Sequence, residues 1–144
     1  IEEKIDTYTA PYRSIAAELF DQHNAYELLE AQGAIEFLST SFIRGTTLDN
    51  AVILVDEMQN LTFHELDSII TRVGRNSRII FSGDYYQTDL SKEADKTGIL
   101  KFLNIMEVMN NFTTIEFGWA DIVRSDFVRD YIMTKDMVER GDIQ

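Results

Sequence analysis

The sequence predicts an α/β fold, with a parallel sheet flanked by helices. Residues 51–55 form an apolar run that ends abruptly at Asp56 and Glu57, and residues 78–82 form a second run that ends at Gly83 and Asp84. Continuous apolar runs rich in β-branched residues are typical of strands buried on both faces of a parallel sheet. Segments with helical patterns alternate with these runs, which also indicates a parallel sheet.

The amino-terminal part is predicted to hold two helices and one strand. A helix is expected over 11–20, because proline is tolerated in a first helical turn and Pro11 would stand there. A second is expected over 25–32, with Asn24 as N-cap and Gly33 as terminator. Residues 34–38 are predicted as a short strand, and 39–50 as a loop.

The remaining elements follow the acidic strand. Thr62 and Glu65 have the spacing of a capping box, and a helical apolar stripe follows until Gly74, which is expected to end the helix. Further elements are predicted as a strand over 78–82, a helix over 97–109, a strand over 114–117 and a closing helix over 125–140.

The residues that follow the two central strands are candidates for phosphate chemistry. Ligands of open α/β sheets bind beyond the carboxyl ends of strands, where Asp56 and Glu57 are expected. In ATPases the first such carboxylate helps hold Mg²⁺, and a following Glu can activate water. Gln87, after the next strand, offers both a donor and an acceptor to a γ-phosphate or its water. The alternatives are a solvated strand end at Asp56 and an ordinary turn at Gly83.

Composition limits the class of protein. The 144 residues are 44% apolar and 26% charged, which suits one globular domain, and no apolar run approaches the ~20 residues of a membrane span, so no membrane partner is expected. Cysteine is absent, which fits a reducing compartment, and His23 and His64 are isolated, which argues against a histidine metal site. The net charge of −12 argues against general DNA affinity.

Several motifs, in order along nearly the whole chain, resemble the PhoH family of P-loop ATPases. The matching stretches are residues 1–8, 42–51, 55–60, 66–74, 82–90 and 121–125. The resemblance implies a P-loop NTPase (RecA-like) core and suggests a phage-like member. One departure is the Walker A loop, G-x-x-x-x-G-K-[ST], which cradles phosphates and does not occur in these residues. Residues 1–144 are therefore expected to form a single partial P-loop ATPase domain that lacks its Walker A strand.

The resemblance also implies roles for individual residues. Asp56 would serve the Mg²⁺ shell, Glu57 the hydrolytic water, and Gln87 the γ-phosphate. Arg124 would reach phosphate in cis or from a neighbouring subunit, with Arg44 as a second candidate, and an ordinary salt bridge is the alternative for both. ATP and Mg²⁺ would be the cofactors. A cytoplasmic homo-oligomer, with RNA or DNA as a further partner, is the implied setting.

Three functions compete at this stage. The first is a nucleoside triphosphatase, active in the complete protein and inactive in this chain alone. The second is a binding or scaffolding module that keeps the ATPase fold without hydrolysis, which the missing Walker A loop favours. The third, a hydrolase that uses the carboxylates of Asp56, Glu57 and Asp84, has no motif of its own.

The resemblance finally predicts a sheet order. Residues 114–117 would lie next to the absent Walker A strand, followed by 78–82, 51–55 and 34–38. Strands 78–82 and 114–117 should therefore run parallel without pairing, about 9–10 Å apart, with a strand from elsewhere between them.

Overall fold

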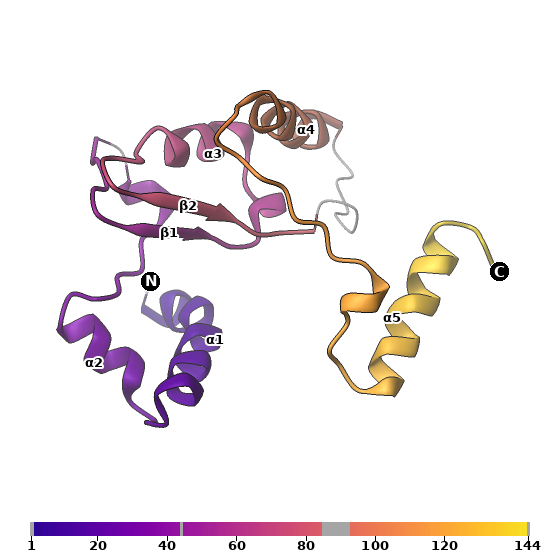
Figure 1. Cartoon of the computed structure of the whole chain (residues 1–144), viewed down its shortest axis with the longest axis horizontal. Helices are drawn as coiled ribbons and strands as arrows, with labels where there is room; N and C mark the ends of the chain where they lie inside the picture. Colours follow the sequence, from indigo (N-terminus) through magenta and orange to yellow (C-terminus); the bar gives the residue numbers. More distant parts are fainter. Residues whose placement is uncertain (1, 44, 85–92, 144) are drawn as a thin grey trace. The chain divides into compact units, whose positions relative to one another are not determined.

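The computed structural model describes residues 2–43, 45–84 and 93–143 of the chain (Figure 1). The chain divides into two compact units, Ile1–Phe102 and Leu103–Gln144. The elements are α1 (Glu2–Phe20), α2 (Ala25–Ala31), η1 (Thr40–Phe42), β1 (Val52–Val55), η2 (Met58–Asn60), α3 (Phe63–Ile70), β2 (Arg78–Phe81), α4 (Glu93–Val108), η3 (Trp119–Asp121) and α5 (Asp126–Glu139).

The two central strands pair in parallel, which confirms the predicted α/β class. Val52 pairs with Arg78, and the register continues to Val55 and Phe81. An isolated parallel bridge between Leu48 and Val73 precedes the ladder. A parallel pair requires a crossover connection, and α3 supplies it.

One face of the sheet packs on helices. The ring centroid of Phe81 lies 5.2 Å from that of Phe102 in α4, and Phe102 lies 6.4 Å from Phe63 in α3. Leu66 and Ile69 of α3 are buried, as are Ile99 and Phe102 of α4. Figure 1 shows α3 and α4 on the same side of the sheet. Apolar burial on this face therefore holds the crossover against the strands.

The opposite face of the sheet is open within the part of the chain that the structure describes. Val52, Leu54 and Ile80 alternate with the covered positions and are 66%, 59% and 52% exposed. The expectation that 51–55 and 78–82 are buried on both faces is therefore wrong within the described ranges, where Val52, Leu54 and Ile80 stay exposed.

The first helix is longer than predicted. It begins at Glu2 rather than at residue 11, so Pro11 lies inside it. Proline removes one helical hydrogen bond, which packing must offset. That packing is made with α2. Ala16 of α1 forms a small core with Ala25 and Tyr26 of α2, and Tyr12 and Ile35 pack against it.

Some of the predicted signals for helix starts and ends are confirmed, and others are wrong. Thr62 and Glu65 form the predicted capping box at the start of α3, and Gly33 follows α2 with φ +71°. Asn24 stands at the N-cap position of α2, but its side chain makes no capping hydrogen bond. Gly74 does not end α3, which stops at Ile70. Gly74 instead allows close approach to the loop before β1, because an added Cβ would lie 2.8 Å from the carbonyl oxygen of Leu48.

Two predicted strands do not form. Residues 34–38 and 114–117 have no regular structure, and the described sheet has the order β1-β2. A strand needs a partner for its backbone groups, and neither run has a ladder here. The predicted adjacency of 51–55 and 78–82 is confirmed. An inserted strand beside β2 stays a prediction.

The second unit carries the closing helix where it was expected. The Ser125 side chain caps α5 by accepting from the backbone N–H of Val128. Trp119 Nε1 donates to Asp136 at 2.9 Å, which ties η3 to α5. Within the described residues, no helix is long and apolar enough to span a membrane.

Candidate functional site

The candidate site lies at the carboxyl ends of β1 and β2, where the backbone ladder continues past the strands. Ser82 N donates to Val55 O at 2.9 Å, and Met58 N donates to Ser82 O at 3.0 Å. These bonds hold the segment after β1 against the segment after β2. Asp56, Glu57 and Asp84 consequently share one end of the sheet.

The carboxylate of Asp56 accepts three hydrogen bonds from the residues that the structure describes. Its Oδ1 accepts from Ser82 Oγ and from the Glu57 backbone N–H, both at 2.9 Å, and its Oδ2 accepts from the Tyr12 hydroxyl at 3.0 Å. These donors come from the segment after β2, the segment after β1, and α1. The orientation of the carboxylate is therefore fixed from three parts of the fold.

Tyr12 keeps its proton in this contact. Burial raises the pKa of the Tyr12 hydroxyl to about 12, assisted by the hydrogen bond to Asp56 and by the charges of Asp56, Glu57 and Tyr26. At neutral pH the hydroxyl is therefore a donor, and a phenolate opposite Asp56 does not form.

Glu57 adopts a left-handed backbone conformation, with φ 54° and ψ 43°. A residue with a Cβ reaches this region at a cost of about 1–2 kcal/mol. The turn directs the Glu57 side chain to η2, where its Oε2 accepts from Gln59 Nε2 at 2.7 Å and from Asn60 Nδ2 at 3.3 Å. Adjacent carboxylates thus acquire different partners and different directions.

Gln59 links the two strand ends. While its Nε2 donates to Glu57, its Oε1 accepts from the backbone N–H of Asp84 at 3.1 Å. Gly83 makes room for this amide, because a Cβ there would lie 2.4 Å from Gln59 Oε1 and 2.8 Å from Met58 Cγ. The side chain of Gln59 therefore couples the position of Glu57 to the turn after β2.

The donor set suits a weakly held Mg²⁺ rather than a protein-built metal cage. Within the described ranges, no three His, Cys, Asp or Glu side chains form a group that could hold a metal ion. Mg²⁺ in nucleotide sites is bound through one or two carboxylates, with waters and phosphates completing the shell. Asp56, whose Oδ2 accepts a single hydrogen bond from the described part of the chain, fits that arrangement.

Comparison with known proteins finds a matching family and several relatives of this chain. The profile of the PhoH-like protein family matches residues 1–136. The chain is 30% identical to a PhoH-like protein of Mycobacterium leprae over 143 residues, 31% to one of Bacillus subtilis over 136, and 32% to Protein PhoH of Escherichia coli K12 over 126. The alignments cover 99%, 94% and 87% of this chain, and 40%, 42% and 35% of the relatives.

The chain belongs to the PhoH family.

PhoH proteins are a family of P-loop ATPases, which agrees with the α/β class and the parallel sheet. The chain spans about 40% of the length of these curated relatives. The activity of a whole PhoH protein is therefore a matter of proposal for this chain.

Three of the predicted site residues have no described position relative to Asp56 and Glu57. Arg44 and Gln87 lie outside the described residues. Arg124 is exposed and precedes the Ser125 cap of α5, in the second unit. Their proposed contacts with phosphate stay predictions.

The PhoH motifs did not indicate every side chain that shapes the site. Tyr12 is separated from Asp56 by 44 positions, and no spacing pattern connects them. Ser82 and Gln59 stand inside the matched motifs but carried no assigned role. Their position near the strand ends could have indicated a role, because polar side chains there can reach a neighbouring carboxylate.

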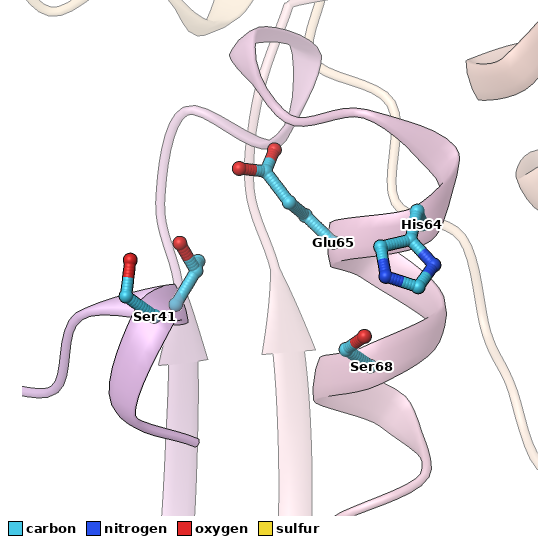
Figure 2. Close-up of a pocket in the computed structure, with 5 residues that line it drawn as sticks. Ser41, His64, Glu65 and Ser68 are labelled. Carbon is cyan, nitrogen blue, oxygen red and sulfur yellow. The ribbon is translucent and has the colours of Figure 1, made fainter. Parts of the chain in front are cut away.

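A separate polar pocket of about 340 Å³ lies between η1 and α3. It is lined by Thr40, Ser41, His64, Glu65 and Ser68. Figure 2 shows Ser41 on η1 across from His64, Glu65 and Ser68 on α3. The predicted site residues with a described position, Asp56, Glu57 and Arg124, do not line this pocket.

Proposed function

We propose that this chain forms the part of an ATP-hydrolysing PhoH domain that supports the Mg²⁺ shell and the attacking water. The observation that carries the proposal is the geometry after β1. Asp56 and Glu57 are consecutive, yet one carboxylate is held by Tyr12 and Ser82 and the other by Gln59 and Asn60. Two separately oriented carboxylates at a strand end suit the two tasks of such a site.

Each carboxylate then has one role. Asp56 would accept hydrogen bonds from metal-bound water, because its Oδ2 retains acceptor capacity. Glu57 would orient the attacking water through the oxygen that Gln59 and Asn60 leave free, and would take its proton. Mg²⁺, when bound, would supply positive charge to the β- and γ-phosphates.

The other residue roles in this proposal come from the family resemblance. Gln87 would contact the γ-phosphate, and Arg124 or Arg44 would stabilise its developing charge. Residues 1–144 would act as one partial domain, and the complete protein as a cytoplasmic homo-oligomer. PhoH membership and the order of the motifs support these assignments.

The test uses the full-length protein, meaning these 144 residues together with the polypeptide that supplies a Walker A loop. Glu57→Gln should leave ATP affinity nearly unchanged and lower kcat by about 10²–10⁴, the usual contribution of a general base. Asp56→Asn should also weaken Mg²⁺-dependent ATP binding. Turnover is measured by phosphate release, and affinity by calorimetry.

Two comparisons make this test specific. Glu36→Gln, at an exposed position before η1, should retain wild-type turnover. The 144-residue chain alone should hydrolyse ATP negligibly, because it lacks the Walker A cradle. A normal kcat for Glu57→Gln would exclude Glu57 as the base.

A scaffolding role is the second candidate, favoured by the missing Walker A motif in these residues. It predicts that the full-length protein binds no ATP and that Glu57→Gln changes no property of the protein. Calorimetry with ATP and Mg²⁺ on the wild type distinguishes the two functions.

Coupling to RNA or DNA, if present, should not come from this chain alone. Its net charge of −12 opposes contact with phosphates. Dissociation constants for non-specific DNA binding are typically about 10⁻⁴–10⁻⁶ M at physiological salt. We expect this chain to bind nucleic acid with a dissociation constant of about 10⁻⁴ M or weaker.

A further inference from the structure

Among the residues that the structure describes, three donors reach Asp56 and leave one main direction open. An ionised carboxylate offers about four lone-pair sites. Ser82 Oγ and Glu57 N occupy the two on Oδ1, and the Tyr12 hydroxyl occupies one on Oδ2. The remaining site belongs to Oδ2, and Tyr12 determines which side of that oxygen it faces.

Tyr12 is well held for such a role. Its ring packs against the Ala16, Ala25 and Tyr26 core between α1 and α2, with Ile35 nearby. The side chain is half-buried, so its rotamers are restricted, and its hydroxyl lies 3.0 Å from Asp56 Oδ2. The donor therefore has a fixed position before any ligand arrives.

We propose that Tyr12 is a positioning residue, whose hydroxyl orients Asp56 so that a single Oδ2 lone pair is directed at the Mg²⁺ shell. The inference rests on the proposed ATPase function and adds α1 to the metal-binding apparatus. Tyr12 does not touch nucleotide or metal in this proposal, and acts through Asp56 alone.

A merely structural role gives a different result. If the Tyr12–Asp56 bond served only to attach α1 to the sheet, its loss would lower the melting temperature and change ATP binding equally with and without Mg²⁺. If it orients Asp56, its loss should weaken the Mg²⁺-dependent part of ATP binding alone.

The experiment measures ATP affinity of the full-length protein by calorimetry, in excess Mg²⁺ and in EDTA. Tyr12→Phe keeps the ring and removes the hydroxyl. We expect ATP binding in Mg²⁺ to weaken by roughly threefold to tenfold, the scale of one net hydrogen bond, with no change in EDTA. Tyr8→Phe, at an exposed position one turn earlier on α1, is the matched control and should resemble the wild type.

Two further variants test the path through Asp56. On an Asp56→Asn background, Tyr12→Phe should have no added effect on Mg²⁺-dependent affinity. Ser82→Ala should act in the same direction as Tyr12→Phe but more weakly, because the Glu57 N–H still donates to Oδ1.

The outcomes separate the two proposals. ATP binding without a Mg²⁺-specific effect of Tyr12→Phe would overturn the positioning role and leave the ATPase proposal standing. An effect of Tyr12→Phe that persists on the Asp56→Asn background would also overturn it. A wild-type protein that binds no ATP would overturn the proposed function itself.

Discussion

At Gly83 the turn after β2 passes too close to the segment after β1 to admit a side chain. An added Cβ would lie 2.4 Å from Gln59 Oε1, 2.8 Å from Met58 Cγ and 3.2 Å from Met58 N. The first of these atoms ends a flexible side chain and can move, whereas Met58 is buried and its backbone is held by Ser82. The glycine is therefore a requirement of packing.

Gly83→Ala should lower the free energy of unfolding by about 1–3 kcal/mol, the usual cost of overpacking, and should displace the Gln59 amide from Asp84. Urea denaturation of the 144-residue chain measures the first effect. Gly118→Ala is the control, because a Cβ there meets its nearest atom at 4.0 Å. Equal stabilities of the two variants would contradict the packing argument.

The sequence could locate the acidic pair but not its geometry. An apolar strand that ends at Asp56 and Glu57 places them at the ligand-binding edge of a parallel sheet, because strand direction and sheet edge follow from the pattern. The left-handed φ of Glu57 leaves no such trace, since glutamate is not a residue that signals positive φ. The contact from Tyr12 depends on how α1 packs, and packing is not periodic in sequence.

At the scale of elements, α3 is stabilised at its start by a reciprocal cap. Thr62 Oγ1 accepts from Glu65 N at 3.2 Å, and Glu65 Oε2 accepts from Thr62 N at 2.8 Å. The helix then carries Leu66 and Ile69 into the layer beneath the sheet. A loosened cap should therefore weaken the covered face of the sheet as well as the helix.

Thr62→Ala should cost about 1 kcal/mol of unfolding free energy, the typical value for loss of an N-cap side chain. Glu65→Gln is the matched control, because glutamine also completes a capping box and should cost less. Both are measured by urea denaturation. A Thr62→Ala variant as stable as wild type would show that the cap contributes nothing to the fold.

Local sequence patterns alone do not determine which apolar runs form strands. Residues 51–55 and 78–82 were predicted correctly because each has a partner in the other. Residues 34–38 and 114–117 carry strand-like residues, yet Ile115 and Phe117 are exposed and neither run pairs. A short apolar run becomes a strand only when a neighbour satisfies its backbone groups. The starts of α3 and α5, which Thr62 and Ser125 cap locally, were predictable, whereas the start of α1 was not.

At the scale of the whole molecule, the open sheet face and the net charge act in opposite directions. Val52, Leu54 and Ile80 form an exposed apolar strip, which favours association between chains. The net charge of −12 opposes it through repulsion, which salt screens. The oligomeric state of the isolated chain should therefore depend on ionic strength.

The 144-residue chain should self-associate more at about 1 M salt than at about 0.1 M salt. The screening length is roughly three times longer at the lower salt concentration, so charge repulsion between chains is stronger there. Leu54→Thr should reduce the association, because threonine keeps strand propensity and lowers apolar area. Val108→Thr, at an exposed position outside the sheet, is the control. Sedimentation velocity measures all three proteins. Monomers at both salt concentrations would contradict the expectation.

The left-handed backbone at Glu57 should make substitutions there affect stability and activity differently. Glu57, the residue proposed to activate water, is held in a conformation that glutamate disfavours and that asparagine or glycine tolerates. Replacements of that kind should preserve or raise the amount of folded protein in a cell while removing activity. The variants with the most folded protein would then be the ones with the least activity. That pattern is expected for a residue that is retained for function at the expense of stability.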